Sequence, residues 1–84
     1  MVDPKSIADL ADQIAEKFHP ERIILFGSYA SRTPTDDSDV DLLVILPFEG
    51  KGAQKVAEIL GAVNPRIPVD LVVRTPDQIR PSYF

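Results

Sequence analysis

The chain is 84 residues long, with a formal net charge of −4, 44% hydrophobic residues and no cysteine. This length predicts one small domain, and the apolar content argues against intrinsic disorder. The acidic balance excludes a protein that grips nucleic acid through clustered Lys and Arg, and the lack of cysteine excludes a disulfide framework, a thiol nucleophile and a zinc–thiolate site.

The first predicted element is a helix from about Pro4 to His19. Asp3 is a suitable N-cap, Pro4 is a favoured first helical residue, and Pro20 marks the end of the pattern. The apolar residues that recur at helical spacing are Ile7, Leu10, Ala11, Ile14, Ala15 and Phe18. This spacing predicts one apolar stripe that faces a core.

Two strands with a turn and a loop between them are predicted next. Ile23–Phe26 is a short apolar run that predicts a buried strand, and Gly27-Ser28 ends it. Tyr29–Arg32 is expected to form a short helical turn, and the composition of Thr33–Ser38 predicts a loop. Val40–Leu46 is the clearest strand pattern in the chain.

The rest of the chain predicts a helix, a strand and a helical fragment. After a loop over Pro47–Gly52, apolar residues return at helical spacing from Ala53 to Val63, and Asn64-Pro65 closes that helix. Val69–Val73 predicts a third strand. Thr75-Pro76-Asp77-Gln78 has the form of a capping box, so a final short helix is expected there.

Three aspartates stand out because they interrupt or open strand patterns. Side chains alternate along a strand, so Asp39 and Asp41 are expected on one face, about 6–7 Å apart. Asp70 lies inside the third apolar strand, where an acid is costly unless it is paired or ligated. Three such carboxylates are typical of a site that holds two divalent cations for phosphoryl chemistry. Taken singly, Asp39 also fits a strand cap, and Asp70 also fits a solvent-facing edge.

The Gly27-Ser28 turn is a candidate phosphate-binding element. Glycine allows a sharp turn and a close approach of the backbone to a ligand, and free N–H groups together with the Ser28 hydroxyl suit phosphate oxygens. Arg32, about one turn further on, is placed to reach the same phosphates. A lone Gly-Ser pair is also an ordinary strand-to-loop turn, and the sequence matches neither a Walker A loop nor a dinucleotide fingerprint.

Taken together, Leu25-Phe-Gly-Ser-Tyr-Ala-Ser-Arg32 and Asp37-Ser-Asp-Val-Asp-Leu-Leu-Val44 resemble the signature of the DNA polymerase beta-like nucleotidyltransferase superfamily. The branch they resemble is that of the minimal nucleotidyltransferases of bacteria and archaea. The resemblance implies an α/β (α+β) fold, with a small mixed sheet of at least three strands, helices packed against it and a polymerase beta palm-like core. Residues 1–84 are expected to form a single minimal nucleotidyltransferase domain.

The resemblance also implies roles for the residues that match. Gly27 and Ser28 correspond to the residues that bind the triphosphate, and Asp39 and Asp41 to two catalytic metal ligands. Asp70 corresponds to the third catalytic carboxylate. Two Mg²⁺ ions are expected as cofactors and ATP as substrate. Relatives commonly have Ala-Arg-Gly after Gly-Ser-Tyr, whereas this chain has Ala30-Ser31-Arg32, so its arginine is displaced by one position and the glycine is absent.

The implied activity is transfer of AMP from ATP to a hydroxyl of a partner protein. Members of this branch are often paired with a small helical HEPN protein, a toxin for which the nucleotidyltransferase is the antitoxin. A non-catalytic antitoxin that binds nucleotide and neutralises its partner by complex formation is an alternative. Transfer to a small molecule is a third, which usually requires a second domain.

The size and hydropathy of the chain lead to expectations about its association with other chains and its cellular location. A core this small leaves little margin of stability, which favours association with a partner chain or with a second copy. The sequence ends at Phe84, where many relatives continue through a final helix, and this is expected to leave part of the sheet less covered. No signal peptide or bilayer-spanning segment is recognised, so a cytoplasmic protein without a membrane partner or direct nucleic-acid binding is expected.

Overall fold

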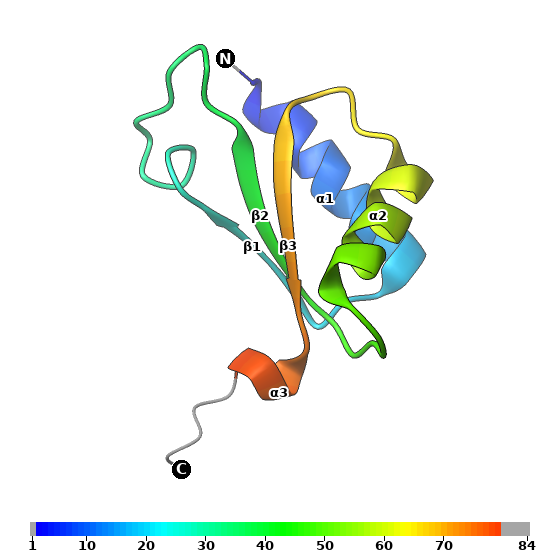
Figure 1. Cartoon of the computed structure of the whole chain (residues 1–84). Coiled ribbons are helices and arrows are strands. Elements are labelled where there is room, and N and C mark those ends of the chain that lie inside the picture. The colour runs from blue at the N-terminus through cyan, green and yellow to red at the C-terminus, as the bar shows by residue number, and fades with distance from the viewer. Residues whose placement is uncertain (1, 80–84) are drawn as a thin grey trace.

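Residues 2–79 are described by the computed structural model of the chain (Figure 1). Their helices and strands follow the order α1, β1, β2, α2, β3 and α3. The bounds are α1 Pro4–Phe18, β1 Arg22–Phe26, β2 Val40–Ile45, α2 Gly52–Val63, β3 Val69–Arg74 and α3 Pro76–Ile79. These bounds confirm the predicted helices and strands to within one residue or so.

The three strands form one mixed sheet with β2 in the centre. β1 pairs with β2 in antiparallel orientation, and β2 pairs with β3 in parallel orientation. The parallel pair requires a crossover, which α2 provides between β2 and β3. The small mixed sheet expected from the sequence is therefore confirmed.

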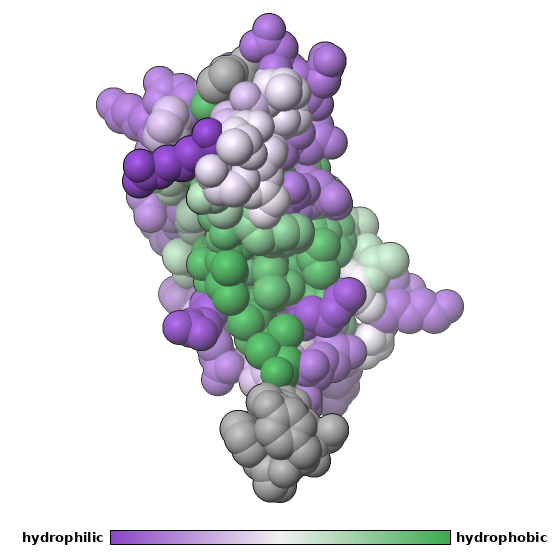
Figure 2. All heavy atoms as spheres, turned by 90° about the vertical axis from the view of Figure 1, so that its left-hand side faces the viewer, coloured by the Kyte–Doolittle hydropathy of each residue, from purple (hydrophilic) through white to green (hydrophobic). Residues whose placement is uncertain are grey.

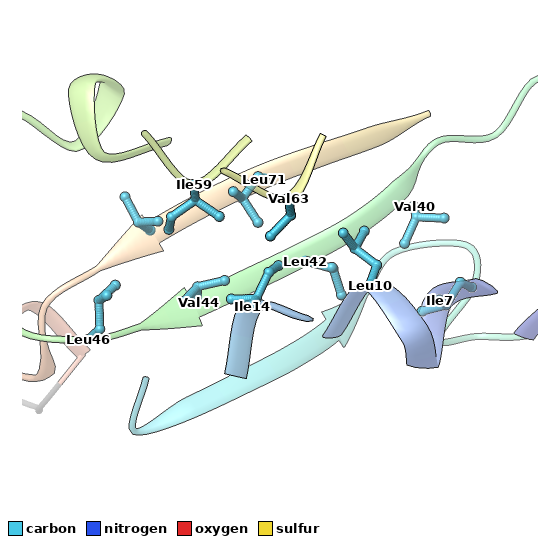
Figure 3. Packing of buried hydrophobic residues seen from close by; sticks show 11 residues of the cluster. Ile7, Leu10, Ile14, Val40, Leu42, Val44, Leu46, Ile59, Val63 and Leu71 are labelled. Carbon is cyan, nitrogen blue, oxygen red and sulfur yellow. The ribbon is translucent and has the colours of Figure 1, made fainter. Parts of the chain in front are cut away.

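Both long helices cover the same face of the sheet (Figure 1). On that face, Val40, Leu42 and Val44 of β2 are 0%, 1% and 0% exposed. Figure 3 shows Leu42 and Val44 between Ile14 of α1 and Ile59 of α2. Alternation along β2 thus places the side chains of Val40, Leu42 and Val44 in the core, as the sequence predicts.

The helix ends are closed by local contacts. The Asp3 carboxylate accepts a hydrogen bond of 2.9 Å from the Lys5 amide, as expected of an N-cap. His19 adopts the left-handed conformation, with φ of 50°, and its amide donates to the Ala15 carbonyl. This cap ends α1 at Phe18, one residue before the predicted end. Asn64 closes α2 in the same way.

The other face of the sheet is called the open face below. Its residues alternate with those of the core, and none of Ile24, Phe26, Leu43 and Val72 belongs to the main hydrophobic cluster. Ile24 and Phe26 are 36% and 38% exposed. Figure 2 shows hydrophobic side chains gathered across the middle of this side of the molecule, with hydrophilic ones around them.

No helix within residues 2–79 is long and apolar enough to cross a membrane.

Candidate active site

Strand pairing arranges the open face in three rows that run across β1, β2 and β3. The rows consist of one residue from each strand, taken at matching register positions. In order along the sheet they are Phe26, Asp41 and Asp70; Ile24, Leu43 and Val72; and Arg22, Ile45 and Arg74. The face therefore has an acidic end, an apolar middle and a basic end.

Asp41 and Asp70 are direct register partners on parallel strands. Neighbouring strands lie about 4.8 Å apart, so the two side chains leave the sheet side by side on the same face. Asp41 is half-buried and Asp70 is exposed, and neither side-chain carboxylate has an ion-pair or hydrogen-bond partner within residues 2–79. Like charges directly opposite one another repel, so this pair is suited to binding a cation.

Asp39 lies one residue before β2 and is exposed. Within the described part of the chain, no group of three or more His, Cys, Asp or Glu residues is close enough to hold a metal ion. The structure therefore brings Asp41 and Asp70 together but does not gather all three predicted carboxylates into one cluster. The donor set fits Mg²⁺, which takes oxygen ligands and is commonly bound by one or two carboxylates together with substrate phosphates.

The Gly27 turn contacts this acidic row directly. Gly27 follows the last residue of β1 and has a φ of +74°, in the left-handed region that favours glycine. A Cβ at this position would overlap the Asp41 carboxylate. The absence of a side chain at Gly27 is therefore what allows the turn to pack against Asp41.

Residues 27–32 form a hydrogen-bonded turn, which agrees with the short helical turn expected over Tyr29–Arg32. The Ser31 amide donates to the Gly27 carbonyl at 3.1 Å, and the Thr33 amide donates to the Ser28 carbonyl at 2.9 Å. The Ser31 hydroxyl lies 3.2 Å from both of these carbonyl oxygens. Positive φ angles at Gly27 and Arg32 prevent a continuous helix here.

Three consecutive amides of this turn are available for a ligand. Among residues 2–79, the backbone N–H groups of Ser28, Tyr29 and Ala30 have no hydrogen-bond acceptor. The Ser28 hydroxyl also has no partner there. Successive free amides in a turn are suited to binding anions such as phosphate. The turn thus supplies donors next to the carboxylate pair without a helix N-terminus.

Arg32 is exposed and adopts a φ of 62°. In the pattern Gly-Ser-Tyr-Ala-Arg-Gly, the last glycine falls at this position. The chain therefore has arginine in place of that glycine, but the backbone still adopts the left-handed conformation. Ser31 occupies the arginine position of that pattern. Its hydroxyl donates hydrogen bonds to the carbonyl oxygens of Gly27 and Ser28 within the turn. The departure in sequence thus leaves the backbone of the turn in the conformation that glycine favours.

Tyr29 anchors the turn to the start of α1, a role that sequence patterns did not reveal. Its hydroxyl accepts a hydrogen bond of 2.7 Å from the amide of Val2, which is 27 residues away. A cavity of about 570 Å³ lies beside this contact. It is lined by Val2, Pro4, Tyr29, Arg32 and Pro34. In the sequence, the one signal that singles out Tyr29 is its place directly after Gly27-Ser28 in the nucleotidyltransferase-like motif.

A family model described as a nucleotidyltransferase domain matches residues 7–83, which is most of the chain and includes the turn and all three aspartates. No curated protein shows significant similarity.

Proposed function

Because the chain belongs to the nucleotidyltransferase domain family, whose general activity is nucleotidyl transfer, we propose that it moves AMP from ATP to a hydroxyl of a partner protein. The observation that carries this proposal is the contact between the Gly27 turn and Asp41. It joins free amide donors for phosphate to the paired carboxylates Asp41 and Asp70. Nucleotidyl transfer needs both, phosphate donors for the triphosphate and carboxylates for metal and proton transfer.

The proposed reaction is an in-line displacement at the α-phosphorus of ATP. The acceptor oxygen forms a bond to this phosphorus while the bond between the phosphorus and the α–β bridging oxygen breaks. Pyrophosphate leaves with the bridging oxygen and its electron pair, and the proton of the acceptor hydroxyl passes to the Asp70 carboxylate. Asp70 suits this step because it is exposed beside Asp41 at the end of the open face.

The other residues hold the nucleotide. The amides of Ser28, Tyr29 and Ala30 and the Ser28 hydroxyl bind phosphate oxygens, and exposed Arg32 adds a positive charge to the same region. Two Mg²⁺ ions bound by Asp39, Asp41 and Asp70 would neutralise charge on the transferred phosphoryl group and on the leaving pyrophosphate.

The proposed acceptor is a small helical protein of the HEPN type, for which this single-domain chain acts as antitoxin in the cytoplasm. The test is incubation of the purified chain with Mg²⁺, the protein encoded beside its gene and ATP labelled at either the α- or the γ-phosphate. Label from α-labelled ATP is expected on the partner, and none from γ-labelled ATP. The double variant Asp39→Ala/Asp41→Ala should transfer at least a hundredfold less. An unlabelled partner, with wild type and double variant indistinguishable, would refute the proposal.

The apolar open face favours a second candidate, neutralisation of the partner by complex formation alone. Exposed Ile24 and Phe26 supply binding area that chemistry at the carboxylates does not need. In this case Asp39→Ala/Asp41→Ala should still bind the partner and protect cells from it. Loss of protection with retained binding would instead support catalysis.

A further inference from the structure

The turn that carries the free amides is joined to the rest of the fold by one long-range hydrogen bond. The Tyr29 hydroxyl accepts it from the Val2 amide at 2.7 Å. In the part of the chain that the structure describes, every other hydrogen bond of residues 28–32 is made to Gly27, to Thr33 or within the turn itself. Those bonds fix the shape of the turn, whereas the bond to Val2 fixes its position.

The Val2 end of this bond is held firmly. Val2 directly precedes Asp3, the N-cap of α1, whose carbonyl accepts hydrogen bonds from the amides of Ser6 at 2.9 Å and Ile7 at 3.3 Å. The side chains of Val2 and Tyr29 are both half-buried and pack against the main hydrophobic cluster. The donor is therefore placed by the first turn of α1, and α1 is placed by the core.

Tyr29 also lies at the centre of the proposed phosphate donors. Its own amide is the middle one of the three consecutive free amides, between those of Ser28 and Ala30. The cavity of about 570 Å³ lies beside its ring, so on that side no packed side chain supports the turn. Without the bond to Val2, packing of the Tyr29 ring and the contact of Gly27 with Asp41 would have to hold the turn in place.

We propose that Tyr29 is a positioning residue for the nucleotide. Its hydroxyl, held by the Val2 amide, keeps the three free amides where a triphosphate beside Asp41 meets all of them at once. This rests on the proposed function for the identity of the ligand. The hydroxyl is already occupied by Val2 and takes no part in the chemistry.

The expected effect is on binding rather than on the chemical step. A turn that is not held in place has to be ordered when the nucleotide binds, and this ordering weakens binding. The loss of one hydrogen bond of ordinary strength corresponds to about a three- to tenfold change in Kd. Since the phosphates are held in the ground state and in the transition state alike, the KM for ATP should rise while kcat is kept.

The test compares Tyr29→Phe, which removes only the hydroxyl, with the control Ile59→Val. Ile59 is a core residue of α2 that is 0% exposed, so its truncation lowers stability without touching the turn. Titration calorimetry with MgATP gives the Kd, and label transfer gives KM and kcat. Tyr29→Phe should raise the Kd and the KM about three- to tenfold with kcat unchanged. Ile59→Val should lose stability in urea and keep the wild-type Kd and KM.

Amide spectra show whether the change arises at the turn. In a ¹H–¹⁵N titration with MgATP, the resonances of Ser28, Tyr29 and Ala30 should shift in wild type and saturate at higher MgATP in Tyr29→Phe. Both variants are also made with Gly61→Ala, which stabilises α2 and meets nothing within 4 Å. The added stability keeps a loss of folding from being read as a loss of binding.

A wild-type Kd in Tyr29→Phe together with lowered stability would overturn the proposal, because the hydroxyl would then serve folding alone. An equal rise in Kd in Ile59→Val would also overturn it, since affinity would then follow general stability. So would a wild type that does not bind MgATP. If Tyr29→Phe weakens MgATP binding but wild type transfers no label, the proposed transfer fails and the positioning role stands.

Discussion

Gly27 is the residue at which the turn of residues 27–32 meets the acidic row. Its φ is +74°, and the Asp41 carboxylate fills the space that a Cβ would need. Gly27→Ala is therefore expected to lower stability by about 1–2 kcal/mol, the cost of a left-handed non-glycine residue, and to push Asp41 out of place. Transfer should fall at least tenfold and the KM for ATP should rise.

Gly61 provides a matched control in the same chain. It is exposed in α2, and a Cβ added there meets nothing within 4 Å. Gly61→Ala should raise stability by about 0.5–1 kcal/mol through helix propensity and leave transfer unchanged. Urea unfolding and label transfer measure both effects. Equal behaviour of the two variants would contradict the role given to Gly27.

Arg32 has a strained backbone conformation, and its positive charge is proposed to favour binding of the nucleotide phosphates. Its φ of 62° lies in the left-handed region. Arg32→Gly is expected to stabilise the chain by about 1 kcal/mol, because it removes the steric cost of the side chain in this region. The same variant should raise the KM for ATP several-fold, since it removes a positive charge near the phosphates. A variant that is both less stable and unaltered in its KM would be inconsistent with both inferences.

At the scale of elements, the sheet aligns Asp41 with Asp70 by the parallel pairing of β2 and β3. Two like charges at directly opposite positions repel, so Asp70→Asn should raise the stability of the ligand-free chain by about 0.2–1 kcal/mol. The same variant should transfer at least a hundredfold less, because in the proposed reaction Asp70 is a metal ligand and the acceptor of the proton. Urea unfolding without Mg²⁺ separates the two effects. A loss of stability in Asp70→Asn would argue against repulsion.

Local patterns made some of these elements predictable from the sequence. The capping box at Thr75 and Gln78 forms as expected, since the Thr75 amide donates to Gln78 Oε1 at 2.9 Å and the Gln78 amide to Thr75 Oγ1 at 3.3 Å. Such contacts join residues three positions apart, which the sequence shows directly. The alternation that buries Val40, Leu42 and Val44 was predictable for the same reason.

Other features depend on residues that are distant in sequence. The turn after β1 was predicted only in outline, as a short helical turn, because no local pattern shows the positive φ at Arg32 or the bond from Val2 to the Tyr29 hydroxyl. The rows of the open face follow from the pairing of β1 with β2 across a long loop, and no local pattern encodes that register. Asp70 could be expected near Asp41, but only the register shows that they are direct partners.

At the scale of the whole molecule, nucleotide binding should stabilise the folded chain. A ligand at 100 times its Kd adds about 2.7 kcal/mol, and each kcal/mol raises the Tm of a domain this size by about 4–8 °C. ATP with Mg²⁺ should therefore raise the Tm of wild type by roughly 10–20 °C at that saturation. With EDTA in place of Mg²⁺ the rise should be much smaller.

The control for this measurement is an exposed aspartate outside the site. Asp12 lies on the exposed side of α1, so Asp12→Asn should keep the full rise in Tm, whereas Asp41→Asn should lose most of it. Differential scanning calorimetry gives these values directly. An equal response of Asp41→Asn and Asp12→Asn to ATP and Mg²⁺ would place the nucleotide elsewhere.

The alternation of side chains along β2 has a consequence for how such a chain evolves. Val40, Leu42 and Val44 hold the core, while Asp41 and Leu43 between them face outward. Substitutions at the outward positions of this sheet leave the packed side of the same strand intact. Selection can therefore change the outward surface of the sheet, at positions such as Ile24 and Leu43, while the packed core and the fold are kept.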